Sequence, residues 1–192
     1  MLKKKFGLEK KSYVLYVGRI DKIKGINYLI KGFKELLLTE KDINLLIAGE
    51  GPYKHKIEDL INKLGISDHV KFLGFVKNER LPYLYNAVDI TLFPSLWEAY
   101  PMVPIESLAC QTPLITTKVG AIPEITRHFK GGYKIIPMKN ANAIKNAIDD
   151  VICGKINESQ IDRENGKKYH NWDNIINNTL AVYDKLNEKY YG

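Results

Sequence analysis

The chain has 192 residues, of which 45% are hydrophobic and 27% are charged, a balance that is typical of a folded globular protein and argues against predominant disorder. Its 29 Lys and Arg residues exceed its 22 Asp and Glu residues, and the net charge of +7 suits a phosphorylated ligand, an anionic membrane or a nucleic acid, as well as a solvated basic surface. The two cysteines, Cys110 and Cys153, form no CxxC pair, which argues against a disulfide or zinc framework.

The basic amino-terminal stretch MLKKKFGLEKK, residues 1–11, is followed by only a short apolar run, SYVLYVG. That run is too short to span a membrane, and it has no cleavage-site pattern. The cysteine usage fits a reducing compartment, and we expect a cytoplasmic protein. Because most of the excess positive charge is scattered lysine, we expect no nucleic-acid partner. Peripheral contact of a basic face with the inner membrane surface stays open.

Short β-rich runs alternate with helical patterns in the first half of the chain. Strand length and β-branched content predict strands over Ser12–Gly18, Ile43–Gly51, Val70–Val76 and Asp89–Pro94. Helical spacing of apolar residues predicts helices over Ile26–Glu40, Tyr53–Leu64 and Glu79–Asn86.

The second half continues with fewer helices between its strands. We expect a helix from about Pro104 to Cys110, strands at Pro113–Thr117 and Tyr133–Pro137, and helices at Ala141–Cys153, Glu158–Tyr169 and Trp172–Tyr190. The last helix carries its large apolar residues on one stripe, and we expect this stripe to pack on its own domain. The stripe consists of Trp172, Ile176, Leu180, Tyr183 and Leu186.

Regular alternation of strands and helices indicates parallel strands joined by right-handed crossovers. We therefore predict an α/β fold, a Rossmann-like three-layer sandwich with a six-stranded parallel sheet, in one domain over residues 1–192. Ligands of such sheets bind at the carboxyl ends of the strands, so the loops after the strands are the candidate site.

The loop GRIDKIKG after the first strand places Arg19 and Lys24 near a helix N-terminus. Two cations and a helix dipole together suit a diphosphate. The alternative is a surface pair of Arg19 with Asp21 or Glu50 and a solvated Lys24. The loop is neither GxGxxG nor a Walker A motif, which disfavours a nicotinamide dehydrogenase and a P-loop NTPase.

Glu98 and Glu106 stand eight positions apart in SLWEAYPMVPIESLAC. On one continuous helix they would be about 12 Å apart, but Pro101 cannot lie inside such a helix. We therefore place Glu98 in a loop and Glu106 on a helix that has Pro104 in its first turn.

Two carboxylates at different depths of one cleft suit hydroxyl groups on both sides of a diphosphate, as in a nucleotide sugar. The alternative, that Glu98 caps a helix and Glu106 pairs with a surface lysine, stays open.

Six motifs follow one another along the chain, and their order carries a family resemblance: VGRI with Lys24 and Gly25, then LLIAGEGP, VKFLGFV, FPSLWEAYPMVPIES, TPLITTKVGAIPEI and NWDNIINNTLAVYDKL. Over roughly Leu8 to Leu186 the chain resembles the carboxyl-terminal, donor-binding domain of retaining glycosyltransferases of the GT-B fold, family 4 type (glycosyl transferases group 1). The resemblance implies that residues 1–11 are an interdomain linker and that the N-terminal acceptor domain is absent. It also implies that residues 172–190 are the C-terminal helix, which in this fold often packs back on the N-terminal domain.

The resemblance also implies roles for individual residues. Arg19 and Lys24 would bind the donor diphosphate beside Gly18 and stabilise the departing nucleotide. Phe75 and Val76 would border the base. Glu98 would contact the transferred sugar, and Glu106 would hold the ribose.

The loop amides of Tyr100, Pro101, Met102 and Val103 would touch sugar and phosphate, although Pro101 replaces a glycine that is common in the family and has no N–H to donate. A hexose would pass with retention from a UDP-, GDP- or ADP-sugar to an acceptor, without a metal or other cofactor.

The sequence leaves two other functions open: a non-catalytic nucleotide-sugar sensor or partner subunit, and a nucleotide-sugar epimerase. A complete transferase would need an N-terminal acceptor-binding domain in cis or in trans. His55, His69, His128 and His170 lack the spacing of metal ligands, and we assign them no catalytic role.

Overall fold

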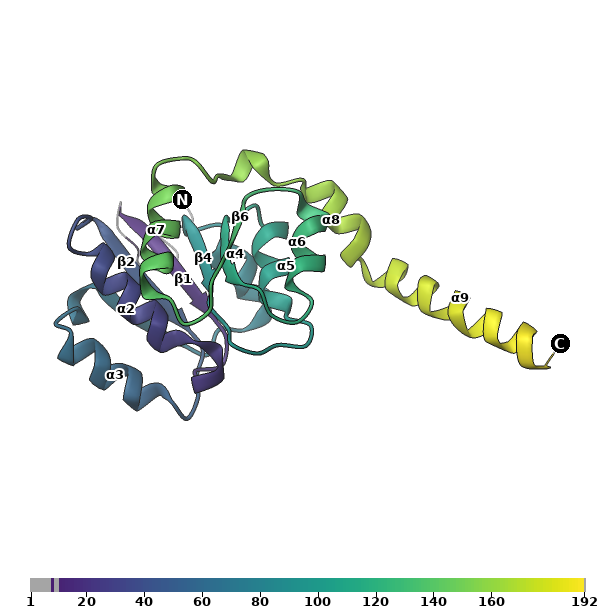
Figure 1. Ribbon diagram of the computed structural model, residues 1–192, viewed down its shortest axis with the longest axis horizontal. Helices are drawn as coiled ribbons and strands as arrows, with labels where there is room; N and C mark the ends of the chain where they lie inside the picture. Colours follow the sequence, from purple (N-terminus) through teal and green to yellow (C-terminus); the bar gives the residue numbers. More distant parts are fainter. Residues whose placement is uncertain (1–7, 9–10, 192) are drawn as a thin grey trace.

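The computed structural model describes residue 8 and residues 11–191. It shows one parallel sheet of six strands in the order β3-β2-β1-β4-β5-β6 (Figure 1). The strands are β1 (Ser12–Val17), β2 (Ile43–Ala48), β3 (Val70–Gly74), β4 (Ile90–Phe93), β5 (Leu114–Thr117) and β6 (Tyr133–Ile136). The predicted fold class is therefore confirmed.

Helices cover both faces of this sheet. One face carries α2 (Ile26–Leu36), α3 (Lys54–Lys63) and α7 (Ala141–Ile152), while α4 (Leu81–Tyr85), α5 (Met102–Ala109), α6 (Ile122–Phe129) and α8 (Arg163–His170) lie on the other (Figure 1). The helix α9 (Trp172–Tyr191) comes last. Four short 3-10 turns complete the description: η1 (Lys22–Lys24), η2 (Ser67–His69), η3 (Asn78–Arg80) and η4 (Glu158–Gln160).

The central strand β1 is buried because its apolar residues face helices on both sides. It pairs in parallel with β2 through Val14 and Leu45, and with β4 through Val14 and Ile90. From β1 the chain builds the sheet outwards first through β2 and β3, and then on the other side from β4 to β6. The strand order therefore reverses between β1 and β4, and crevices at such switch points bind ligands.

Several predicted boundaries differ from the structure. No helix was predicted between the fifth and sixth strands, yet α6 forms there, with Pro123 in its first turn and with Ile122, Ile125 and Phe129 buried on one face. The predicted helix at Glu158–Tyr169 is divided, because Asp162 caps a new helix by accepting a hydrogen bond from the Asn165 backbone N–H. The predicted linker, residues 1–11, lies almost entirely outside the described residues.

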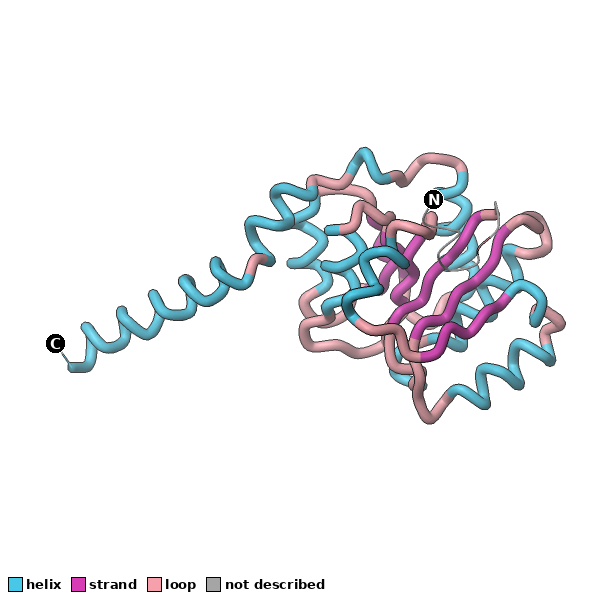
Figure 2. Tube along the Cα trace, turned by 180° about the vertical axis from the view of Figure 1, so that it is seen from behind, coloured by secondary structure: helices cyan, strands magenta, loops and turns pink. Residues whose placement is uncertain are grey.

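The prediction for the last helix is wrong. α9 projects away from the sheet and its covering helices (Figure 2). Its apolar stripe is exposed along its length, with Trp172 69% and Tyr183 63% exposed. The helical spacing correctly predicted an apolar face but could not identify what covers it. No helix among the described residues combines the length and apolarity that a membrane crossing requires.

Candidate functional site

The loops after β1 and β2 are packed together at the carboxyl edge of the sheet. Gly18 and Gly49 adopt φ angles of 144° and 146°, which residues with a side chain rarely adopt. A Cβ atom on Gly49 would lie 1.9 Å from the Gly18 carbonyl oxygen, so there is no room for a side chain there. These glycines bring two loop backbones into contact beside the strand ends.

A cavity of about 330 Å³ opens at the carboxyl ends of the first three strands. Its lining joins the strand ends with η3 and α4: Val17, Gly18, Arg19, Ala48, Gly49, Glu50, Phe75, Val76, Asn78 and Leu81. Much of this lining is aliphatic or aromatic, and Arg19 stands among it with its side chain 66% exposed and its Nε 3.6 Å from an oxygen of Asp21. The cavity thus combines apolar walls with one exposed cation, a combination that is typical of ligand pockets.

Lys24, which follows β1, and Glu98, which follows β4, form an ion pair at the switch point. The Lys24 Nζ atom lies 2.6 Å from Glu98 Oε1, and the two side chains are only 21% and 10% exposed. The Ser95 hydroxyl also donates a hydrogen bond to Glu98 Oε1, at 2.7 Å. Two donors therefore fix the Glu98 carboxylate, and a half-buried pair of this kind is less screened by solvent than a surface pair.

The start of α2 is pressed against the end of β4. Gly25 has a φ of 67°, and a Cβ atom on it would lie 2.0 Å from the Pro94 carbonyl oxygen. The free backbone N–H groups that begin a helix therefore lie at the same edge of the sheet as Lys24. This arrangement gathers positive potential at the switch point.

Glu106 lies on α5 and accepts a hydrogen bond from a buried tyrosine on α4. The Tyr85 hydroxyl lies 2.8 Å from Glu106 Oε2. Burial, and then the negative charge of Glu106, raise the pKa of Tyr85 far above its ordinary value. Tyr85 therefore stays protonated and orients the Glu106 carboxylate.

Tyr16 plays a similar part under the loop after β1. Its hydroxyl donates a hydrogen bond to the Arg19 carbonyl oxygen at 2.8 Å. Burial raises the pKa of Tyr16, and the charges of Glu98 and Asp21 raise it further. The neutral hydroxyl thus supports the backbone that carries Arg19.

The structure brings the predicted site residues together in three groups. Gly18, Arg19, Phe75 and Val76 line the cavity, Lys24 pairs with Glu98, and Glu106 bonds to Tyr85. The alternative pairing of Arg19 with Asp21 is present in the structure. Lys24, however, is not a freely solvated lysine, Glu98 makes no helix cap, and Glu106 pairs with a tyrosine rather than a lysine. Their roles toward a ligand stay predictions.

The segment Tyr100–Val103 differs from the expected loop. The helix α5 begins at Met102 rather than near Pro104, so Met102 and Val103 are helical. Pro101 is buried and precedes the helix with φ −79° and ψ 134°, an extended conformation that suits a proline. Tyr100 points its hydroxyl toward α8, where it lies 3.1 Å from His170 Nδ1.

Sequence reasoning missed Ser95, Tyr85, His128 and His170. Ser95 stands three residues before Glu98, and that spacing alone could have suggested a local bond. The Tyr85–Glu106 pair and the contact of His170 with Tyr100 join distant segments, and nothing in the local sequence pattern indicates them.

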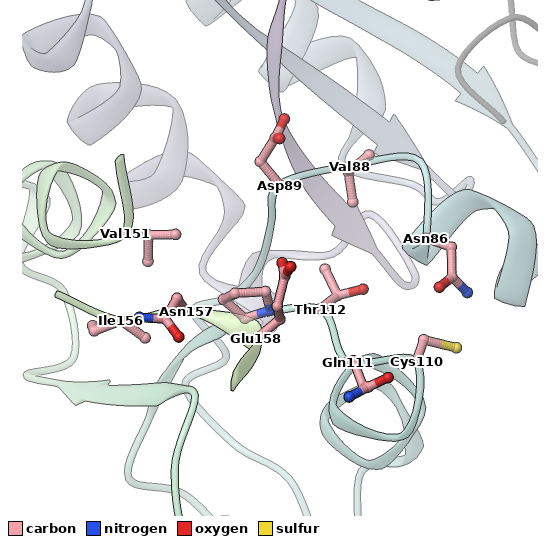
Figure 3. Close-up of a pocket in the computed structure, with 11 residues that line it drawn as sticks. Asn86, Val88, Asp89, Cys110, Gln111, Thr112, Val151, Ile156, Asn157 and Glu158 are labelled. Atoms are coloured by element: carbon pink, nitrogen blue, oxygen red, sulfur yellow. The ribbon is translucent and has the colours of Figure 1, made fainter. Parts of the chain in front are cut away.

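A larger cavity, of about 510 Å³, lies at the opposite edge, where β4 and β5 begin (Figure 3). Asp89 and Val88 precede β4, Cys110 to Pro113 lead into β5, and Ile156 to Glu158 follow α7. None of the predicted site residues lines it. The rule for parallel sheets favours the carboxyl edge instead.

Fold and site together define a Rossmann-type α/β domain with Arg19, Lys24 and the start of α2 at the carboxyl edge of its sheet. The chain belongs to the family described as "Glycosyl transferases group 1", whose pattern matches residues 2–169.

Known proteins that are similar to this chain agree with this family. The chain is 35% identical over 173 residues to an uncharacterized glycosyltransferase of Methanocaldococcus jannaschii, covering 88% of this chain and 44% of the relative. A sucrose-phosphate synthase from Thermosynechococcus elongatus superposes with a TM-score of 0.85 at 28% identity, covering 96% of this chain and 48% of that one.

A third match is the C-terminal domain of a glycosyl transferase group 1 family protein from Francisella tularensis. It has a TM-score of 0.73 at 27% identity, covering 86% of this chain and 87% of that one. The chain spans about half the length of the curated relatives it matches.

Proposed function

We propose that this chain binds a nucleoside diphosphate sugar at the carboxyl edge of its sheet and forms the donor-binding part of a retaining hexosyltransferase. The observation that carries the proposal is the Lys24–Glu98 pair, which sets a cation and a carboxylate 2.6 Å apart at the carboxyl edge of the sheet, the edge at which the apolar cavity opens. A diphosphate needs cations, and the sugar attached to it needs hydrogen-bond acceptors for its hydroxyls. The pair supplies both at one point.

In this proposal the parts of the donor follow the edge of the sheet. The base enters the cavity beside Phe75 and Val76, and Glu106 accepts a hydrogen bond from the ribose. The diphosphate lies over Gly18 toward Arg19 and Lys24. Because an ammonium group has three N–H donors, Lys24 can hold a phosphate oxygen while it stays bonded to Glu98.

The remaining contacts involve the start of α5. Glu98 accepts from hydroxyls of the hexose, and the backbone around Tyr100, Met102 and Val103 lies next to the sugar and phosphate. Pro101 has no N–H to donate. The sugar is therefore bound by side chains and by the neighbouring amides.

During transfer the acceptor oxygen forms its bond to the anomeric carbon on the face from which the diphosphate departs. The bond from that carbon to the phosphate oxygen breaks, and the acceptor proton passes to the departing phosphate oxygen. Arg19 and Lys24 stabilise the negative charge that develops there.

We propose that this reaction needs no metal or other cofactor. Arg19, Lys24 and the N-terminus of α2 supply positive charge at the position where a metal would otherwise neutralise the diphosphate. The donor would be a UDP-, GDP- or ADP-sugar. Its acceptor would be bound by an N-terminal domain, in cis or in trans, and the enzyme would work in the cytoplasm, with the inner membrane surface as a further site of contact.

The test is calorimetry of nucleoside diphosphates and their sugars on the wild type, Arg19→Ala and Lys24→Ala. A thermal-shift screen of UDP, GDP, ADP and their sugars first selects the ligand, because binding to the native state raises stability. Loss of one charged hydrogen bond should weaken diphosphate binding by about 1.5 to 3 kcal/mol, roughly 10- to 100-fold. Lys22→Ala, at an exposed lysine of the same loop, is the matched control and should keep wild-type affinity.

Lys24→Ala also leaves the Glu98 charge without its partner, so the double variant Lys24→Ala/Glu98→Gln separates the two effects. It should bind the diphosphate as weakly as Lys24→Ala does, since the cation is still missing. Wild-type affinity in Arg19→Ala and Lys24→Ala would contradict the proposed site.

A further inference from the structure

Three aromatic side chains from distant segments, Tyr100, His170 and His128, form a continuous hydrogen-bonded network. The Tyr100 hydroxyl lies 3.1 Å from His170 Nδ1, and His170 Nε2 lies 3.3 Å from His128 Nδ1. The His170 ring also stacks on Phe129, with ring centroids 5.6 Å apart and planes within 6° of parallel. This network joins the loop after β4 to the end of α8 and to α6.

Helix α8, which carries His170 of this network, is packed closely on α6. Gly166 lies so close to Phe129 that a Cβ atom would come within 2.1 Å of the ring. The Asn165 side-chain amide donates a hydrogen bond to the His128 carbonyl oxygen at 2.6 Å, and Asp162 N donates to the Phe129 carbonyl oxygen at 2.8 Å. His170 is therefore presented from a fixed position.

At its other end the network reaches Tyr100, in the loop segment that follows Glu98. Its neighbour Ala99 accepts a hydrogen bond from the Ala121 backbone N–H at 3.0 Å, and a Cβ atom on Gly120 would lie 2.4 Å from the Glu98 carbonyl oxygen. Lys24 and Ser95 hold the Glu98 carboxylate. The contact with His170 holds the segment at its other end, one residue before Pro101.

We propose that His170, oriented by His128, is a positioning residue that acts through Tyr100 to hold the loop carrying Glu98 against the sugar of the donor. The inference rests on the proposed function and adds residues that contact no part of the donor. Breaking this network frees the Tyr100 end of the loop. The Glu98 carboxylate is then no longer held in place to accept hydrogen bonds from the sugar, while the diphosphate keeps its contacts with Arg19 and Lys24.

The two contacts of the hydrogen-bonded network tolerate one added proton but not two. With both rings neutral, each contact has one N–H or O–H donor and one acceptor, in either direction along the network. One added proton keeps both contacts, because a doubly protonated His170 can donate to Tyr100 and to His128. Two added protons place N–H groups of His128 and His170 face to face, and that contact is then lost.

The surroundings favour the neutral ring. Burial lowers the pKa of His170 and the neighbouring His128 lowers it further, while Glu124 and the Ile125 carbonyl oxygen act in the opposite direction. Lys167 on α8 and Asp173 on α9 line the same hollow as His170. A lowered folded-state pKa means that the neutral His170 ring contributes stability that is present above the ordinary histidine pKa of 6.5 and is lost as the pH falls through the folded-state value.

The first experiment needs no ligand. Amide hydrogen exchange at Ala121 reports on the loop because this N–H donates to Ala99. It should accelerate at least about 5-fold in Tyr100→Phe, which removes one oxygen from a half-exposed side chain, and in His170→Gln. His170→Asn places its amide near the former Nδ1 position and should restore slow exchange. Unchanged exchange in both Tyr100→Phe and His170→Gln would overturn the inference.

The second experiment compares affinities for a nucleoside diphosphate and for its sugar at pH 7.5. Tyr100→Phe and His170→Gln should lower affinity for the nucleotide sugar about 5- to 10-fold and leave that for the diphosphate unchanged, with His170→Asn close to wild type. His55→Asn, at an exposed histidine of α3, is the matched control.

The two proposals fail in different ways. A wild type that binds no nucleotide or nucleotide sugar overturns the proposed function and the sugar-positioning role with it. A wild type that binds both, with variants that keep its ratio of affinities, overturns the role of His170 alone.

Discussion

Two buried tyrosines, Tyr16 and Tyr85, support the charged residues of the candidate site. Each donates its hydroxyl hydrogen, one to the Arg19 carbonyl oxygen and one to the Glu106 carboxylate. Both have a raised pKa, chiefly because burial disfavours the phenolate. The site is thus built on neutral hydroxyl donors that keep their protons.

This arrangement predicts how stability depends on alkaline pH. Above the ordinary tyrosine pKa of 10.0, the unfolded chain releases the Tyr85 proton and the native chain retains it. The free energy of unfolding should therefore fall with rising pH by about 1.4 kcal/mol per pH unit for this group. In Tyr85→Phe, that contribution to the slope is absent.

Urea unfolding between pH 9 and 11.5 measures both effects. At pH 9, Tyr85→Phe should be less stable than the wild type by about 1.5 to 3 kcal/mol, because a hydrogen bond to a charged group is lost. The two curves should then converge as the pH rises. Parallel curves would contradict the raised pKa, and Tyr183→Phe, at an exposed site on α9, is the matched control.

How far the sequence predicts such a site depends on the residue. Arg19, Lys24 and Glu98 stand directly after strands, so the general rule for parallel sheets places them at one edge. The direct pairing of Lys24 with Glu98 could not be predicted, because it depends on how closely Gly25 lets the start of α2 approach β4. Tyr85 was missed because its hydroxyl meets Glu106 only after two helices pack together.

Among the elements, α6 and α8 connect the site to the end of the domain. Gly166 allows the close approach of these helices, since Phe129 fills the space that a side chain would need. Asn165 and Asp162 add hydrogen bonds from α8 to the end of α6. The position of His170 depends on this packing.

Gly166→Ala tests this packing by the sign of its effect. Alanine is a better helix former than glycine, so helix propensity alone predicts a gain of about 1 kcal/mol. The structure predicts a loss of about 1 to 3 kcal/mol instead, because the new Cβ atom would overlap the Phe129 ring. Urea unfolding gives the free energy.

The matched variant for this test is Phe129→Leu. Leucine makes space at the crossing, so Gly166→Ala should cost clearly less in the Phe129→Leu background than in the wild type. A stabilised Gly166→Ala single variant would show that α8 does not pack closely on α6 in solution.

The same elements show which parts of the fold the sequence predicts. Strands such as β1 and β2 are continuous apolar runs bounded by turn residues, and their pattern identifies them locally. α6 was missed because it has only 8 residues and follows a glycine turn. The interruption at Asp162 was missed because a cap needs a carboxylate and a free backbone N–H to meet in space.

At the scale of the whole molecule, α9 stands apart from the rest. The helix has 20 residues and projects from the end of α8, and its large apolar residues are exposed rather than packed on the sheet or its covering helices (Figure 1). Periodicity predicts such a stripe equally well for a packed helix and for a projecting one. Only the three-dimensional structure distinguishes them.

A variant that ends at Asn171 tests this arrangement. Because side chains such as Leu180 and Tyr183 remain exposed in the folded chain, removing α9 takes away little buried apolar area. The free energy of unfolding should therefore change by less than about 1 kcal/mol. A second variant, ending at Asp162, also removes α8 with Gly166 and His170, and it should lose at least about 3 kcal/mol because Phe129 loses its cover. Urea unfolding of the three chains decides: a comparable loss in both variants would mean that α9 packs on the domain in solution, as the sequence pattern alone predicted.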